Sequence, residues 1–432
     1  MITGTVTLNG GDAAILLAED AILREAAGEP LEISIFDSHP GAARKYYPMY
    51  DFRLSLLVNG LRPFSRLRAL RPLIRGANYR RFLWGVELQL SPLRRLSRLL
   101  LSAREVRDLS TFARADVIAF TGGMYLVENY SLRARFFDME LARRLQKTVL
   151  FLPQSMGPFT TNENRHIMGE CLAGADLVLL RDARSRSHVL DLVPDHPNAH
   201  VVPDMAFGLK VRDPMINGPG STSGGCPADS RLRVAVSVRA WPFFKTMTAD
   251  DGMRNLMRVI AAAVTELVST HDASLVFIST CQGVSEYWTD DSRVAQDICC
   301  LLPNELRRRV TIDTAFHDPR DLAEKLRGFD FAITTRMHAA MLSMVAGTPV
   351  LPIAYEFKTN ELFASMGLAE WVSDIETIRE DDFVRLMGRF IERLPQVGAA
   401  TVAAVKRQQE ALEETTRLLG QALQRGAEVA PL

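Results

Sequence analysis

The chain has few cysteines, and they lack the spacing of a metal site. The five cysteines, at positions 171, 226, 281, 299 and 300, contain no Cys-x-x-Cys pair. None of them combines with the eight histidines at a zinc-ligand spacing. We therefore expect reduced thiols, as in a cytoplasmic protein, and no bound metal.

The chain also lacks a charge surplus and a long apolar run. Lys plus Arg and Asp plus Glu both number 51, so the overall charge does not indicate a nucleic-acid partner. No window reaches about 18 uninterrupted apolar residues, and the first residues lack the basic patch and apolar core of a signal peptide. We expect a cytoplasmic protein whose contact with the inner face of the membrane is at most peripheral.

What is abundant is the alternation of apolar strands with helical patterns. A length of 432 residues exceeds what one hydrophobic core usually supports, so two domains are expected. The Gly/Pro/Ser-rich run DPMINGPGSTSGGCPAD, from position 213, is typical of a linker. We predict a first domain over 1–212, a linker over 213–231, a second domain over 232–375 and terminal helices over 376–432.

The segment 330–358 has the pattern of a strand, a turn, a short helix and a second strand. An apolar strand over 331–334 is followed by Arg336 and His338, and a helix from 337 would stop at Gly347. Ligands of a parallel sheet bind past the carboxyl ends of its strands, where a helix N-terminus attracts anions. We predict that these two side chains hold a carboxylate or phosphate, although a surface arginine and a capping histidine would also fit the spacing.

Other strand ends carry polar residues or glycine in the same way. Arg239 follows the strand predicted over 233–238, although an isolated arginine there is more often part of a surface ion pair. The strand over 116–120 ends in Gly122-Gly123, and the strand over 148–152 leads to Gln154. The remaining strand ends carry Arg181-Asp182 and Pro203-Asp204. These positions are where a parallel α/β sheet forms its site.

Near the start of the chain, a Gly-rich turn precedes an apolar helix predicted over 13–27. Asn9, Gly11 and Asp12 belong to this turn. Asp12 suits the N-cap of the helix, and a capping role alone would account for it.

An arginine-rich segment lies between Leu61 and Asp108. Its arginines are interleaved with Leu, Phe and Trp and stand at 62, 66, 68, 71, 75, 80, 81, 94, 95, 98, 104 and 107. The spacing predicts one amphipathic basic helix over 92–106. A solvated helical insertion is the favoured interpretation. The alternative is contact with an anionic membrane surface or an anionic, lipid-linked acceptor through residues 61–108.

The string TRMHAAMLSMVAGTPVLPIAYEFK resembles the C-terminal motif of the polysaccharide pyruvyl transferase family, with Arg-x-His, Gly-Thr-Pro-Val and Tyr-x-x-Lys. The family is also similar in its Asn-x-Gly-Asp start, glycine pair, Gln-Ser-x-Gly-Pro, Arg-Asp and Pro-Asp. The resemblance runs from Asn9 to about Leu368, and it is weakest over the arginine-rich segment. One departure is the short first strand, for which only Met1–Thr5 is available.

The resemblance implies an α/β fold of two Rossmann-like domains whose parallel sheets face a cleft, as in GT-B enzymes, with C-terminal helices. It also implies transfer of a pyruvyl group from phosphoenolpyruvate to two hydroxyls of one sugar, with no metal and no further cofactor. Phosphoenolpyruvate carries two anionic groups, so donor binding falls to Arg239, Arg336, His338 and Lys358. His338 would be the general acid and Asp12 the base across the cleft. On the acceptor side the implied residues are Asn9, Gly11, Asp12, Gly122, Gly123 and Gln154.

Two other functions stay open at this point. A nucleotide-sugar glycosyltransferase or epimerase of the same architecture would use the basic pair on a diphosphate, with Glu356 or Glu361 binding the ribose. A non-catalytic sugar or anion sensor would bind phosphoenolpyruvate without turnover.

Overall fold

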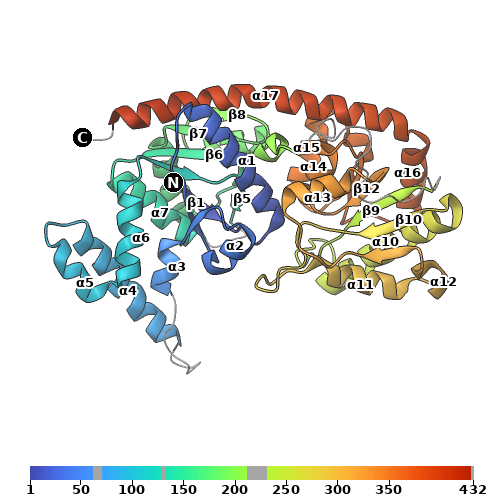
Figure 1. The fold of residues 1–432 in the computed structure, drawn as a ribbon, viewed down its shortest axis with the longest axis horizontal. Coiled ribbons are helices and arrows are strands. Elements are labelled where there is room, and N and C mark those ends of the chain that lie inside the picture. The colour runs from blue at the N-terminus through green and yellow to red at the C-terminus, as the bar shows by residue number, and fades with distance from the viewer. Residues whose placement is uncertain (62–70, 129–131, 212–230, 430–432) are drawn as a thin grey trace. The chain divides into compact units, whose positions relative to one another are not determined.

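The computed structural model describes residues 1–61, 71–128, 132–211 and 231–429. Its contacts divide the chain into two α/β units (Figure 1). Unit 1 comprises Met1–Thr7, Glu19–Asp204 and Leu412–Leu432, and unit 2 comprises Leu8–Ala18 and Met205–Ala411. The predicted linker, 213–231, lies outside the described residues except for Arg231.

Unit 1 is built on a sheet in which every strand pairing is parallel. Its order is β3-β2-β1-β4-β6-β7-β8, and β5 pairs with β6. The strands are β1 (Ile2–Thr5), β2 (Ser34–Asp37), β3 (Asp51–Leu54), β4 (Val117–Phe120), β5 (Gly123–Leu126), β6 (Thr148–Met156), β7 (Leu177–Leu180) and β8 (Ala199–Val201). Because the strand order reverses between β1 and β4, the ends of these two strands form the switch point at which such sheets bind ligands.

Helices connect these strands. They are α1 (Gly10–Ala27), α2 (Pro40–Tyr46), α3 (Leu56–Leu61), α4 (Arg71–Gln89), α5 (Ser97–Leu100), α6 (Ala103–Arg114), α7 (Arg133–Arg144), α8 (Asn162–Ala173) and α9 (Ala183–Leu190). The prediction of one helix over 92–106 is wrong. A 3₁₀ turn (Arg94–Leu96) and α5 precede a new helix, because Ser102 and Glu105 form a capping box that begins α6.

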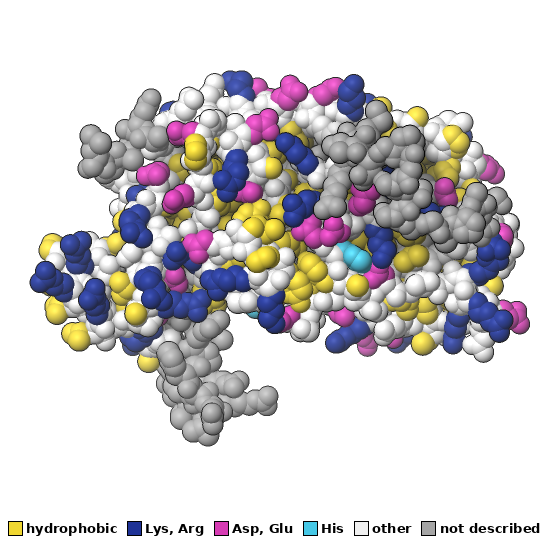
Figure 2. Space-filling model, viewed as in Figure 1, with side chains coloured by type: hydrophobic (Ala, Val, Ile, Leu, Met, Phe, Trp, Pro, Cys, Tyr) yellow, Lys and Arg dark blue, Asp and Glu magenta, His cyan; other side chains and the backbone are white. Residues whose placement is uncertain are grey.

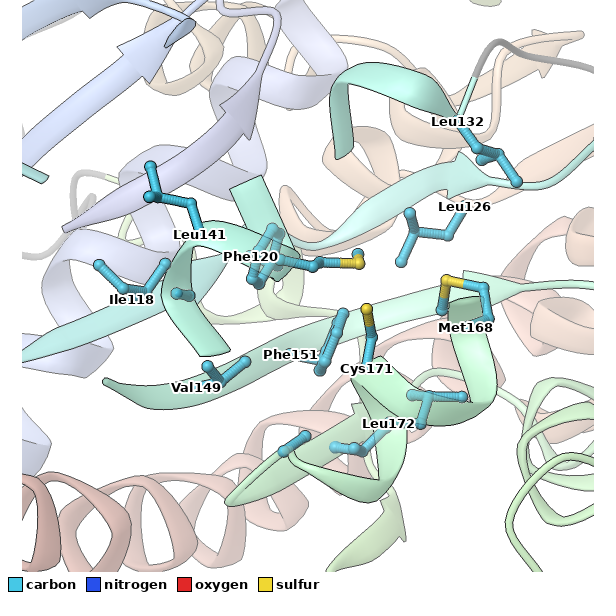
Figure 3. Close-up of a cluster of buried hydrophobic side chains, with 14 of the residues drawn as sticks. Ile118, Phe120, Leu126, Leu132, Leu141, Val149, Phe151, Met168, Cys171 and Leu172 are labelled. Atoms are coloured by element: carbon cyan, nitrogen blue, oxygen red, sulfur yellow. The ribbon is translucent and has the colours of Figure 1, made fainter. Parts of the chain in front are cut away.

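The core of unit 1 lies between its sheet and the covering helices (Figure 3). The rings of Phe120 on β4 and Phe151 on β6 stack with their centroids 5.0 Å apart. Met168 and Leu172 of α8 are fully buried in the same cluster. Strands packed in this way are apolar along most of their length. Polar residues at their carboxyl ends can therefore be recognised in the sequence.

Unit 2 is built on a second, six-stranded parallel sheet. Its order is β11-β10-β9-β12-β13-β14. The strands are β9 (Arg233–Ser237), β10 (Ser274–Phe277), β11 (Val310–Ile312), β12 (Phe331–Thr334), β13 (Val350–Ala354) and β14 (Ser373–Asp374). The switch point of this sheet lies between β9 and β12. The helices are α10 (Ala249–His271), α11 (Asp291–Leu301), α12 (Asn304–Arg307), α13 (Pro319–Leu326), α14 (Met337–Val345), α15 (Phe357–Ser365), α16 (Glu380–Glu392) and α17 (Leu394–Val429).

Two chain segments group differently from the predicted domains. Residues 8–18, expected in the first domain, belong to unit 2. The backbone N–H of Gly10 donates to the carbonyl of Thr280 (3.1 Å), and the thiol of Cys281 donates to Asn9 Oδ1 (3.2 Å). At the other end of the chain, α17 belongs to unit 2 up to Ala411 and to unit 1 from Leu412.

The start of α1 also differs from the prediction. The helix begins at Gly10, so Asp12 lies in its first turn and is not the N-cap residue. Asn9 has the capping role, since its side chain accepts from the backbone N–H of Gly11 (3.0 Å). A β-carbon on Gly10 would stand 2.2 Å from the Thr280 oxygen, so only glycine permits this backbone approach.

Candidate functional site

Two arginines mark the switch point of the unit 2 sheet. Arg239 stands two residues after the end of β9, and Arg336 stands two residues after the end of β12. These strands are parallel neighbours, with Ser237 opposite Thr334. The two cations therefore follow adjacent strands at the same edge of one sheet, as predicted.

Arg336 is buried and held by a carboxylate that the sequence did not reveal. Its Nε and Nη2 donate to the two carboxylate oxygens of Asp291, the second over 2.7 Å. Burial alone lowers the pKa of Arg336, but the charge and hydrogen bonds of Asp291 raise that pKa well above its usual value. The guanidinium is thus charged and fixed in direction, with its Nη1 outside the pair.

Arg239 is half-buried and lies against two aromatic rings. Its Nη1 donates to the hydroxyl of Tyr355 (2.7 Å). Its guanidinium carbon lies 4.7 Å from the Tyr355 ring centroid and 5.3 Å from that of Trp241. Cation–π contacts of this kind orient an arginine without neutralising its charge.

His338 stands in the first turn of α14, and its imidazole lies against Gly11. A β-carbon on Gly11 would stand 2.6 Å from His338 Nδ1, so no larger residue fits there without moving the ring. The turn at the start of α1 therefore brings Asp12 into the same unit as His338. The N-terminus of α14 adds a partial positive charge at this edge.

Cys281 and Tyr287, to which no sequence pattern assigns a role, interact electrostatically with the same residues. Burial raises the pKa of the Cys281 thiol to about 11, the charge of Arg336 opposes this shift, and those of Asp291 and Asp12 add to it. Burial likewise raises the pKa of Tyr287, and the charges of Cys281 and Asp12 raise it further. Both groups are neutral near pH 7, so they add hydrogen-bonding capacity but no charge.

Lys358 lies in the first turn of α15, after the end of β13. Its ammonium is 2.8 Å from a carboxylate oxygen of Glu356 and 5.5 Å from the ring centroid of Tyr355. The four predicted donor-binding residues all lie in unit 2, as do Asn9, Gly11 and Asp12.

The other predicted acceptor-side residues lie in unit 1. The carboxylate of Glu19, fully buried, accepts from the backbone N–H of Gly122 (2.5 Å) and from the hydroxyl of Thr121 (2.8 Å). Gly123 has a φ of 124°, a backbone conformation that favours glycine, and pairs with Gln154 of β6. Both glycines thus shape the chain after β4.

Gln154 is fully buried. The predicted strand over 148–152 leads to Gln154, but β6 runs on to Met156, so Gln154 lies inside the strand. Within the described residues, neither its Nε2 nor its Oε1 has a hydrogen-bond partner. Buried amides normally have partners, so this one has capacity for a ligand or a water molecule. Its neighbour Ser155 donates to Asp182 (2.6 Å), and Arg181 pairs with Asp204, so the three predicted strand-end motifs join in one network.

The described part of the chain shows neither a metal-binding cluster nor a membrane-spanning helix. Residues 1–61, 71–128, 132–211 and 231–429 contain no group of three or more His, Cys, Asp or Glu that could hold a metal ion. No helix within these ranges is long and apolar enough to cross a membrane.

Comparison with solved structures bears out the predicted fold. A UDP-GlcNAc 2-epimerase from Neisseria meningitidis bound to UDP-GlcNAc matches with a TM-score of 0.53 and 12% identity, covering 96% of this chain and 98% of that one. HepE from Anabaena in complex with UDP matches with a TM-score of 0.55 and 11% identity, covering 99% of each chain. At these identities the likeness shows the fold alone, the GT-B-like pair of parallel α/β sheets.

Comparison with sequences shows the family. The amylovoran biosynthesis protein AmsJ of Erwinia amylovora is 24% identical over 301 residues, which are 68% of this chain and 69% of that protein. The family model described as polysaccharide pyruvyl transferase matches residues 9–356. This range runs from the Asn9 turn through Arg239, Arg336 and His338. The chain therefore belongs to the polysaccharide pyruvyl transferase family.

Proposed function

We propose that this transferase of polysaccharide biosynthesis moves the pyruvyl group of phosphoenolpyruvate onto two hydroxyls of one sugar, forming a pyruvate ketal and releasing phosphate. The observation that carries the proposal is the switch point of unit 2, where Arg239, Arg336 and His338 follow adjacent strands. Family membership supports the class of reaction. The acceptor is a sugar of a polysaccharide or of its precursor.

Donor binding would use fixed cations. Phosphoenolpyruvate carries a carboxylate and a phosphate on one carbon, so its site needs more than one positive group. Arg336, held by Asp291, would offer the substrate the N–H groups that lie outside this pair, those of Nη1 included, and Arg239 would supply a second cation oriented by Tyr355. The N-terminus of α14 and Lys358, whose charge Glu356 offsets in part, would complete the binding of the phosphate.

The chemistry needs one proton donor and one proton acceptor. His338 would protonate the methylene carbon, giving an oxocarbenium-like centre at C2. A sugar hydroxyl attacks C2 and loses its proton to Asp12. The C2–O bond to phosphate then breaks, the second hydroxyl closes the ketal, and its proton leaves with the phosphate. Two O–H bonds are broken. One proton leaves with the phosphate, and the other, taken by Asp12, returns through solvent to His338, which has given its own proton to carbon.

For the acceptor we assign Gly122, Gly123 and Gln154 of unit 1, of which Gln154 carries the unused amide atoms. Asn9 and Gly11 would act indirectly, because they position Asp12 and His338.

Unit 2 carries two exposed aromatic rings at which a sugar would bind. Trp288, with 76% of its surface exposed, follows β10 and packs against Tyr287. Phe243, with 58% exposed, follows β9 and packs against Trp241. Flat rings of this kind stack on the C–H faces of sugars.

The competing hypothesis is a nucleotide-sugar enzyme, because both solved structures above contain UDP or a UDP-sugar. It would place a ribose on Glu356 or Glu361. Glu356 is already paired with Lys358 (2.8 Å), which weakens this assignment for one of the two acids.

The test is calorimetric titration with phosphoenolpyruvate and, separately, with UDP-sugars. The informative variant is Arg239→Ala, and its matched control is Arg233→Ala, which removes an exposed arginine from the opposite end of the same strand. We expect phosphoenolpyruvate binding that weakens at least tenfold in Arg239→Ala and is unchanged in the control. Binding of a UDP-sugar with no response to phosphoenolpyruvate would make the chain a nucleotide-sugar enzyme. Binding of phosphoenolpyruvate with no phosphate release on any acceptor glycan would favour a sensor.

A further inference from the structure

A short segment of unit 1 exposes leucines and arginines in alternation. We call residues 92–99 the Leu/Arg loop. Its exposed leucines are Leu93, Leu96 and Leu99, at 58%, 46% and 81% of their surface, and its exposed arginines are Arg94, Arg95 and Arg98. Large apolar side chains that are this exposed within one short segment indicate an interaction surface.

The loop is anchored, so this exposure is a fixed feature of the structure. Ser97 is fully buried, and its hydroxyl donates to the side chain of Gln89 on α4 (2.6 Å). Leu101, just beyond the loop, packs on Gly85, where a β-carbon would come within 2.4 Å of it. Arg81 donates to the carbonyl of Leu100 and pairs with Glu105. These contacts hold the segment against α4 and the first turn of α6.

The geometry places the leucines together. A 3₁₀ turn, Arg94–Leu96, has three residues per turn, so side chains at i and i+3 lie on the same face. Leu93 and Leu96 have this spacing, and Leu99 continues it into α5. In Figure 2 hydrophobic and basic side chains lie side by side at the end of the view where Figure 1 places α5.

The loop itself carries positive charge that no acid pairs with. Residues 71–108 contain nine arginines and three acids, Glu87, Glu105 and Asp108. Glu87 pairs with Arg144 (2.6 Å), Glu105 with Arg81 (2.7 Å) and Asp108 with Arg104 (3.7 Å). Within the described residues, the three loop arginines form no ion pair. The acids of this segment therefore pair with arginines outside the loop and leave the charge of the loop arginines unpaired.

We propose that the Leu/Arg loop docks on the surface of an anionic lipid bilayer. The leucines would enter the boundary between headgroups and acyl chains, and the arginines would bind lipid phosphates. A second copy of this chain is a poorer occupant, since a symmetric contact would set arginines against arginines. The proposal does not depend on the donor chemistry of unit 2.

The test is sedimentation of the full chain with vesicles of phosphatidylcholine alone or with one quarter phosphatidylglycerol. We expect binding to the anionic vesicles only, weakening as salt is raised. The triple variant Arg94→Gln/Arg95→Gln/Arg98→Gln should bind on the order of 100-fold more weakly. The triple variant Leu93→Ser/Leu96→Ser/Leu99→Ser should also lose binding, although its charge is unchanged.

The matched control is Arg254→Gln/Arg385→Gln/Arg417→Gln, which removes three exposed arginines elsewhere and should bind vesicles more tightly than the loop arginine variant. Equal sedimentation with both vesicle types, or equal loss in the control and loop arginine variants, would overturn the proposal. So would an oligomer, seen by light scattering, that dissociates in the leucine variant, because the loop would then bind a second copy. We expect the loop variants to keep the melting temperature and the phosphoenolpyruvate binding of wild type. A loss of vesicle binding alone then tests the loop and not the proposed function.

Discussion

The imidazole of His338 lies on Gly11, so close that a β-carbon there would stand 2.6 Å from Nδ1. These residues are 327 positions apart in the sequence, and each belongs to a separate motif of the family. The thiol of Cys281 donates to Asn9 and so holds the same turn against the segment that follows β10. Gly11 of the N-terminal motif therefore leaves the space that the imidazole of His338, in the C-terminal motif, occupies.

Replacement of this glycine should impair catalysis more than folding. In Gly11→Ala the methyl group would displace the His338 ring from its position. If His338 is the general acid, phosphate release with an acceptor glycan should fall about 100-fold or more. Affinity for phosphoenolpyruvate should change less than tenfold, because Arg239 and Arg336 are untouched.

The matched control for Gly11→Ala is Gly388→Ala in α16. A β-carbon there has open space around it, and alanine is the better helix former, so activity should be retained. Wild-type turnover in Gly11→Ala would show that the position of His338 does not matter for the reaction.

The two arginines at the switch point should differ in what they contribute to stability. Arg336→Ala leaves the carboxylate of Asp291 buried without its cation, which costs roughly 3–5 kcal/mol of unfolding free energy. Arg239 is half-exposed and contacts rings and a hydroxyl, so Arg239→Ala should cost about 1 kcal/mol. Urea denaturation of both variants measures the difference. Equal losses in the two variants would mean that burial of Asp291 does not depend on its pair with Arg336. Because Arg336→Ala is expected to destabilise the protein, Arg239→Ala is the better variant for testing donor binding.

The sequence predicted the strands of unit 2 well where local signals agree. The strand over 331–334 was confirmed residue for residue, and the second strand of the segment 330–358 was found as β13, since each is a short apolar run that is buried in the sheet. The rule that ligands bind at strand ends then placed Arg239 and Arg336 at one edge. The prediction of one helix over 92–106 was wrong. The sequence contains the capping-box signal Ser102-x-x-Glu105, which begins a new helix even where the helical spacing of apolar residues continues through it.

What the sequence could not reveal depends on distant contacts. Asp291 opens a helix 14 residues after the end of β10, and its partner Arg336 comes 45 residues later. No local pattern identifies such a pair. Nor does any pattern show that residues 8–18 belong with unit 2, because that follows from hydrogen bonds to Thr280 and Cys281.

A buried carboxyl group in unit 1 should make stability depend on pH. Asp138 of α7 accepts from the hydroxyl of Thr3 (2.7 Å), and its Oδ1 has no partner within the described residues. Burial raises the pKa of Asp138 from 3.8 to about 6, against the opposing effects of Thr3 and Arg135. The folded protein therefore binds this proton more tightly than the unfolded chain, so the contribution of Asp138 to stability falls as the pH rises from about 4 to 6 and then levels off.

The variant Asp138→Asn should remove this dependence. Asparagine has nearly the same shape and can still accept the hydrogen bond from Thr3, but it carries no charge at any pH. The shift of about two pKa units corresponds to roughly 3 kcal/mol. The unfolding free energy of the variant, relative to that of wild type, should therefore rise between pH 4 and 6. By pH 7 this rise should reach about 3 kcal/mol. Urea denaturation of both proteins at several pH values measures the gain. A difference that stays constant from pH 4 to 8 would mean that Asp138 titrates alike in the folded and unfolded chains, because only unequal proton binding gives the difference a slope with pH.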